Sequence, residues 1–143
     1  MVASGFAATI GLEVTHADGD EVRGRLPLAP VTLGADGGLH PGAVSTVVET
    51  LASVGAALWL GERGQVVGVT NATEFLAAPA AGTVAAVARP LLRGEDAQLW
   101  SVVLTLEGAH PDQEHGQDGQ DGQVVADGRV RLQNLRGRSG ARR

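Results

Sequence analysis

Alternating apolar and polar positions predict two short strands near the start of the chain. In residues 21–29 (EVRGRLPLA), the apolar or small side chains recur at every second position, which is typical of a strand with one face in the core and one in water. Residues 10–17 (IGLEVTHA) precede this segment across the turn sequence ADGD, so the two are predicted to form an antiparallel hairpin. Pro27 places the second strand at a sheet edge or near its own end, because proline cannot donate into a ladder.

The longest apolar segment is LHPGAVSTVVETLASVGAALWLG, residues 39–61, and its only formal charge is on Glu49. It is too long for a strand. Pro41 suits a first helical turn, and Gly61 suits a C-terminal stop. The pattern therefore predicts a helix from Pro41 to Leu60, about 30 Å long at 1.5 Å per residue.

Four strand-like runs follow the helix, and a polar insert at 108–122 separates the last two of them. The runs cover residues 65–76, 82–92, 97–107 and 123–134. Two strands, one long helix and four strands with short connections predict an α+β fold, with an antiparallel six-stranded sheet curled around the helix. Residues 30–38 are predicted to be an irregular connection, and the insert is expected to be a loop at a hairpin tip.

Length and charge limit the organisation and the partners. The 143 residues fit one domain, which we place at residues 1–135. The remaining residues, 136–143 (RGRSGARR), are expected to form a basic, disordered tail. Formal net charge is −5, and part of the positive charge lies in that tail, so nucleic-acid binding is not expected.

The absence of cysteine excludes disulfides, zinc–thiolate sites, iron–sulfur clusters and cysteine nucleophiles. The N-terminus lacks the basic start of a signal peptide, and no run of 18 apolar residues occurs. We therefore expect a cytoplasmic protein without a membrane partner.

Glu49 is the first candidate for chemistry. Four-residue spacing places Ser45, Glu49 and Ser53 in one row on the predicted helix. The row could be a solvated stripe of an amphipathic helix. A solvated face would be expected to carry several charges, however, so the lone carboxylate favours a helix enclosed on nearly all sides, where the carboxylate must be satisfied or reactive.

A carboxylate in a dry pocket can attack an acyl carbon or activate a water molecule. Ser53 could hold either the carboxylate or that water. Unpaired backbone N–H groups at the helix start, from Gly42 onward, could stabilise an oxyanion, whereas Pro41 has no N–H to donate. His40 either makes a local hydrogen bond at the helix entry or positions a thioester carbonyl.

Metal and phosphate sites are not expected. The other histidines, His16, His110 and His115, have no ligand spacing, and Asp118 and Asp121 lack the further ligands of a calcium loop. No glycine-rich phosphate-binding motif occurs. The predicted site therefore uses neither a metal nor a cofactor.

The sequence resembles the hotdog-fold acyl-CoA thioesterases of the phenylacetate-degradation and Arthrobacter-type 4-hydroxybenzoyl-CoA branch. The resemblance covers residues 39–135, and its motifs are LHPG with VVETLAS, VVGVTNATEFLAAPAAGTVAAVARPLLRG, and QLWSVVL. The helix motif of that family has a histidine, then an acidic residue, then a small hydroxyl residue one turn later. These positions correspond to His40, Glu49 and Ser53.

The resemblance implies a central helix wrapped by the sheet, and a homodimer, or a homotetramer of two dimers, with active sites between subunits. Glu49 would be the nucleophile or general base, Ser53 would orient the carboxylate or the water, and His40 would bind on the thioester carbonyl side. The resemblance further assigns residues to the acyl-CoA substrate: Asn71, Thr73 and Phe75 to the pantetheine channel, and Arg93 and Gly94 to the turn near the coenzyme A phosphates.

The sequence departs from the family pattern at three places. Gly34 replaces a glutamine that contacts the thioester oxygen, and Pro41 replaces a glycine whose N–H is an oxyanion donor. Glu95 and Asp96 replace a basic residue after the coenzyme A turn. The preferred interpretation is a metal-free acyl-CoA or acyl-pantetheine thioester hydrolase. A catalytically weak hotdog-fold acyl-CoA-binding or scaffold protein is the main alternative, and a hydratase is a third.

Overall fold

The structure is a computed structural model that describes residues 4–108 and 122–136. Its central element is helix α2, Pro41–Leu60, which begins and ends where the sequence predicts. Gly61 follows the helix with a φ of 57°, a left-handed conformation that glycine adopts without strain. Helix α2 is long and apolar enough to cross a bilayer, but in this fold it is the core helix.

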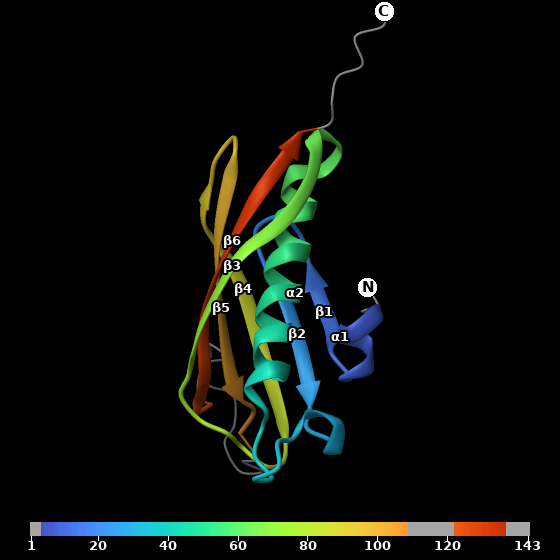
Figure 1. The fold of residues 1–143 in the computed structure, drawn as a ribbon, viewed down its shortest axis with the longest axis vertical. Coiled ribbons are helices and arrows are strands. Elements are labelled where there is room, and N and C mark those ends of the chain that lie inside the picture. Colours follow the sequence, from blue (N-terminus) through green and yellow to red (C-terminus); the bar gives the residue numbers. More distant parts are fainter. Residues whose placement is uncertain (1–3, 109–121, 137–143) are drawn as a thin grey trace, which may run out of the picture.

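Six strands form one antiparallel sheet that curls around α2 (Figure 1). They are β1 (Glu13–Ala17), β2 (Val22–Pro27), β3 (Gly64–Phe75), β4 (Thr83–Arg93), β5 (Ala97–Leu106) and β6 (Val124–Arg136). Their spatial order is β1-β2-β4-β5-β6-β3, so β1 and β3 are the two edges. The predicted α+β architecture and the predicted order of these elements are confirmed.

Three short helical segments were not predicted: α1 (Gly5–Thr9) and two 3₁₀ turns, η1 (Pro30–Thr32) and η2 (Gly61–Arg63). Each is too short to show a helical hydrophobic period. Strand β6 extends to Arg136, one residue into the stretch expected to be a tail. Residues 137–143 and most of the polar insert, with its histidines and aspartates, lie outside the described residues.

Small residues let α2 approach the sheet closely. A Cβ on Gly55 would lie 2.5 Å from ring atoms of Trp100, which is fully buried. The Trp100 ring cannot easily move, because its Nε1 donates to Gln98 Oε1 at 2.9 Å. Gln98 Nε2 in turn donates to the Ala56 carbonyl and to Asn134 Oδ1. This satisfied polar network fixes the distance between helix and sheet.

Gly55→Ala is therefore expected to lower the free energy of unfolding by about 1–3 kcal/mol, the usual cost of overpacking. Helix propensity alone predicts the opposite sign, a gain of about 1 kcal/mol. Urea denaturation of the variant and the wild type gives the sign directly. A variant more stable than the wild type would show that the helix does not need this close approach.

Candidate active site

Glu49 lies in the middle of α2, on the side of the helix that faces β3. Its side chain is partly buried. Ser53 Oγ donates to Glu49 Oε1 at 3.4 Å, as the one-turn spacing predicts. Within the described part of the chain, no arginine or histidine forms an ion pair with Glu49. Neutral donors therefore hold the carboxylate, which is neither a free surface group nor fully enclosed in one protomer.

Strand β3 supplies the other contacts of Glu49. Asn71 Nδ2 lies 3.3 Å from Glu49 Oε2 and 3.1 Å from the Ser45 carbonyl oxygen. Thr73 Oγ1 donates to Asn71 Oδ1 at 2.7 Å. Gly68 lies directly under the carboxylate, and a Cβ there would be 2.0 Å from Glu49 Oε1. Two residues expected to line a substrate channel, Asn71 and Thr73, thus lie beside the candidate catalytic group.

His40 is the N-cap of α2, and it uses the backbone donor that was expected to bind an oxyanion. Gly42 N donates to His40 Nδ1 at 2.9 Å. The next two N–H groups, of Ala43 and Val44, both donate to the His40 carbonyl. Because Pro41 has no N–H, the first turn offers no free donor in this conformation. His40 therefore makes the local hydrogen bond at the helix entry, and the oxyanion role of Gly42 stays a prediction.

A cavity of about 510 Å³ opens beside this helix start. Its apolar wall contains Leu39, Val44 and Phe75, and its polar side contains Asp36 and His40. Gly34, at the position where the family resemblance implies a glutamine, also lines the cavity and leaves that side open. Glu49 lies seven residues beyond Gly42, about 10 Å along the helix. Within one protomer, the helix start and the carboxylate cannot contact the same carbonyl group.

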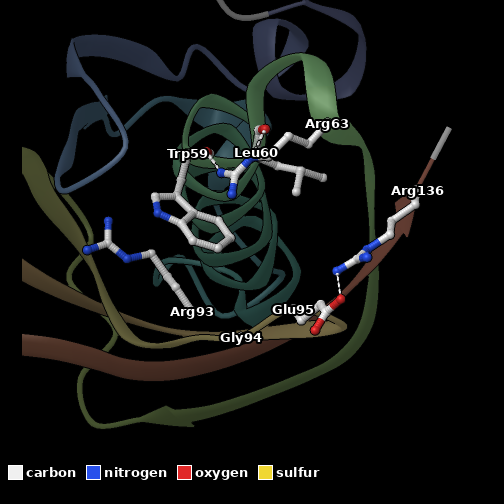
Figure 2. A pocket seen from close by; sticks show the side chains of 7 residues that line it. All are labelled: Trp59, Leu60, Arg63, Arg93, Gly94, Glu95 and Arg136. Atoms are coloured by element: carbon white, nitrogen blue, oxygen red, sulfur yellow. Dashed lines mark hydrogen bonds and ion pairs between the residues drawn. The ribbon is translucent and has the colours of Figure 1, made fainter.

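A second cavity, of about 570 Å³, lies at the other end of α2 (Figure 2). Three arginines and one aromatic ring dominate its lining, and they come from α2, η2, the end of β4 and the end of β6. Arg63 lies over the Trp59 ring, with its guanidinium carbon 4.4 Å from the ring centroid. Arg93 is farther from the same ring, at 5.6 Å. Arg136 reaches across the opening toward the turn.

The arginines of the second cavity have internal partners. Arg93 donates to the Gly19 carbonyl at 2.7 Å and to Asp20 Oδ1 at 2.6 Å, and Arg136 pairs with Glu95. Arg63 donates to backbone carbonyls at the end of α2 and forms no ion pair within the described ranges. In the part of the chain that the structure describes, Arg63 is thus the arginine of this cavity whose charge no acidic side chain balances.

The predicted site residues therefore lie in three places along α2. Glu49, Ser53, Asn71 and Thr73 meet at its middle; His40, Gly42 and Phe75 lie at its start; and Arg93 and Gly94 lie near its end. No cluster of three or more metal-ligating side chains occurs within residues 4–108 and 122–136.

Sequence reasoning missed four residues at these places: Gly68, Trp59, Arg63 and Arg136. Only Gly68 carried a usable signal, because a glycine inside a valine-rich strand often marks a bulge or a close approach.

Comparisons with known proteins agree with this geometry. The model of the thioesterase superfamily matches residues 36–110. A Mycobacterium tuberculosis protein whose name describes it as an esterase is 39% identical over 136 residues, covering 93% of this chain and 88% of that protein. A solved structure of such an M. tuberculosis esterase has a TM-score of 0.81 at 37% identity, covering 93% of this chain and 98% of that one.

Two further solved structures have the same fold. AziG of S. sahachiroi has a TM-score of 0.82 at 34% identity, covering 94% of this chain and 98% of that one. A thioesterase of Haemophilus influenzae has a TM-score of 0.80 at 22% identity, covering 94% of this chain and 85% of that one. At 22% identity, the likeness to the H. influenzae thioesterase is evidence for the fold alone.

Proposed function

The chain belongs to the thioesterase superfamily, and on this premise we propose that it hydrolyses acyl thioesters of coenzyme A or of another pantetheine carrier. The observation that carries the proposal is the lone carboxylate of Glu49, which Ser53 and Asn71 hold on the central helix. The narrower resemblance to the phenylacetate-degradation and 4-hydroxybenzoyl-CoA branch stays a prediction. So do the cytoplasmic location and the absence of nucleic-acid and membrane partners.

Glu49 can cleave a thioester by either of two routes. In one, a carboxylate oxygen attacks the acyl carbon, the C–S bond breaks with release of the thiolate, and water hydrolyses the resulting anhydride. In the other, Glu49 takes a proton from a water molecule as that water attacks the same carbon. Ser53 would orient the carboxylate or the water. Neither route requires a metal or an organic cofactor.

The site is proposed to lie between two protomers. Strand β3 has one free edge, and Val67 and Val69 on it are 44% and 50% exposed. Glu49 faces this strand. Since about 10 Å of helix separates Gly42 from Glu49, we propose that a partner's helix start supplies the oxyanion donor, which requires its Gly42 N–H to leave His40 Nδ1 when substrate binds. We propose a homodimer, or a tetramer of two such dimers, in which His40 and Gly42 of one protomer complete the site of the other.

The two cavities fit the two ends of such a substrate. The apolar cavity beside His40 and Phe75 suits an acyl group, and the arginine cavity suits the phosphates of the carrier. Trp59 lies ten residues beyond Glu49, about 15 Å along α2, a distance comparable with a pantetheine arm. As the resemblance implies, we assign Arg93 and Gly94 to binding of the coenzyme A phosphates. Arg63 and Arg136 line the same cavity, and we assign them the same role.

Arg63→Gln is expected to raise the KM for an acyl-CoA about tenfold, because one charge-assisted hydrogen bond to phosphate is lost. The kcat should not change, and neither should the KM for an acyl-N-acetylcysteamine thioester, which lacks the nucleotide. Steady-state release of free thiol measures both substrates. Arg129→Gln, on the outer face of β6, is the matched control. Equal KM values for acyl-CoA in wild type and Arg63→Gln would show that this cavity does not bind the phosphates of the carrier.

A second candidate function is acyl-CoA binding with weak or no catalysis. The observation in its favour is the first turn of α2, where Gly42 N–H is held by His40 and Pro41 has no N–H. A panel of acyl-CoA thioesters separates the two functions. Binding by calorimetry without thiol release would support the binding protein, and turnover of any thioester above the uncatalysed rate would support the hydrolase.

A further inference from the structure

The carboxylate of Glu49 rests on a part of β3 that has no side chain. A Cβ on Gly68 would lie 2.0 Å from Glu49 Oε1 and 3.1 Å from its Cδ. Gly68 does not have a positive φ, so backbone strain does not explain the glycine. The pairing of β3 with β6 shifts register between Gly68 and Thr70, which marks a bulge at this point. The requirement at position 68 is therefore space for the carboxylate.

The second feature is the orientation of the Asn71 amide. Its Oδ1 accepts from Thr73 Oγ1 at 2.7 Å, so its Nδ2 is turned toward Glu49 and the Ser45 carbonyl. Without the hydroxyl of Thr73, the amide could rotate and present its oxygen to the carboxylate, which is repulsive. Thr73 thus acts on Glu49 through Asn71.

The position of Thr73 is itself fixed by a glycine on the neighbouring strand. Gly128 pairs with Thr73 in the β3–β6 ladder. A Cβ on Gly128 would lie 3.0 Å from Thr73 Oγ1 and 2.6 Å from Val48 Cγ1. The absence of a side chain there lets both the threonine and the helix keep their places. These contacts connect β6, β3 and α2 at one point.

We propose that Gly68, Asn71 and Thr73 are positioning residues that fix the carboxylate of Glu49 for its reaction with the thioester. This rests on the proposed function, in which Glu49 is the reacting group. Ser53 donates to Oε1 of Glu49, and Asn71 donates to Oε2. Gly68 leaves room for the carboxylate in the position that these two hydrogen bonds set. The role differs from the channel lining that the family resemblance implies for Asn71 and Thr73, because the substrate need not touch either residue.

Gly68→Ala tests the steric part of this proposal. The group that the new Cβ displaces is the end of a flexible side chain, so the variant should fold and keep its melting temperature. Displacing a reacting group by about 1 Å costs about 10²-fold in rate, and we expect a loss of this size in kcat with little change in KM. An unchanged kcat, or a loss accompanied by an equal loss of folded protein, would overturn the assignment of Gly68.

Thr73→Val and Thr73→Ser test the hydrogen-bonded part. Valine keeps the shape of threonine but removes the hydroxyl, so kcat should fall about tenfold for the loss of one oriented hydrogen bond. Serine keeps the hydroxyl and should retain most of the activity. Thr70→Val is the matched control, since Thr70 pairs with exposed Arg131 on the other face of the strand. Equal kcat values for Thr73→Val and Thr73→Ser would overturn the role of Thr73.

A parallel assay of Glu49→Gln separates this inference from the proposed function. If Glu49→Gln is inactive while Gly68→Ala and Thr73→Val match the wild type, the positioning role is wrong and the function stands. If Glu49→Gln is as active as the wild type, Glu49 is not the reacting group and both proposals fail. The expected order of kcat is wild type, then Thr73→Val, then Gly68→Ala, then Glu49→Gln.

Discussion

Glu49→Gln is expected to lower the kcat for thioester hydrolysis by at least about 10³-fold, the scale seen when a central catalytic group is removed. Glutamine has the shape of glutamate, so the fold and the contact with Ser53 can persist. Its amide can neither attack an acyl carbon nor accept a proton from water at neutral pH. Release of free thiol from the best substrate of an acyl-CoA panel measures the loss.

Glu74→Gln is the matched control for this experiment. Glu74 is an exposed carboxylate on the same β3 strand, on the face away from α2. Its neutralisation changes the net charge of the protein by the same amount and should leave kcat unchanged. Equal rates for Glu49→Gln and the wild type would refute the assignment of Glu49, whatever the substrate.

Replacing both Val67 and Val69 by lysine is expected to separate the protomers and to reduce hydrolysis at least about 10²-fold. Four like charges would face one another across two paired β3 edges, which is strongly unfavourable for strand pairing. Each separated protomer would keep Glu49 but lose the partner's oxyanion donor, and losing such a donor costs about 10²–10³ in turnover. Light scattering after size-exclusion chromatography gives the mass, and thiol release gives the activity.

Phe6→Lys is the control for added charge at an exposed apolar position. Phe6 is 67% exposed on α1, which lies near β1 at the opposite edge of the sheet (Figure 1). The Phe6→Lys variant should have the same mass in solution and the same activity as the wild type. A Val67→Lys, Val69→Lys variant that stays dimeric would show that β3 is not the interface. A monomeric variant with full activity would show that one protomer contains the whole site.

Local sequence signals were sufficient for most of the fold. Pro41 and Gly61 marked the ends of α2. Proline suits the first turn, where its missing N–H is not needed, and glycine suits the backbone conformation that ends a helix. The alternation around Val22 and Leu26 marked β2 for a similar reason. Helix α1 had no such signal, since its five residues bury only Ala7.

The candidate site was predicted only where its contacts are local. Glu49 and Ser53 are four residues apart on one helix, so their hydrogen bond follows from the helical repeat. Asn71 is 22 residues from Glu49 along the chain, and its contact depends on how β3 packs against α2. The same is true of Arg136, which reaches Glu95 only because β6 ends beside the β4–β5 turn. Tertiary packing of this kind leaves no periodic trace in a single sequence.

The free edge of β3 also has a consequence for a single protomer. On the side facing away from β6, strand β3 presents unpaired backbone groups beside exposed valines, and such an edge can template pairing with any extended peptide. A protomer with this edge uncovered would therefore be the species most prone to aggregation. In the proposed dimer, covering this edge would protect the solubility of the protein, and the same contact would bring a second chain to Glu49.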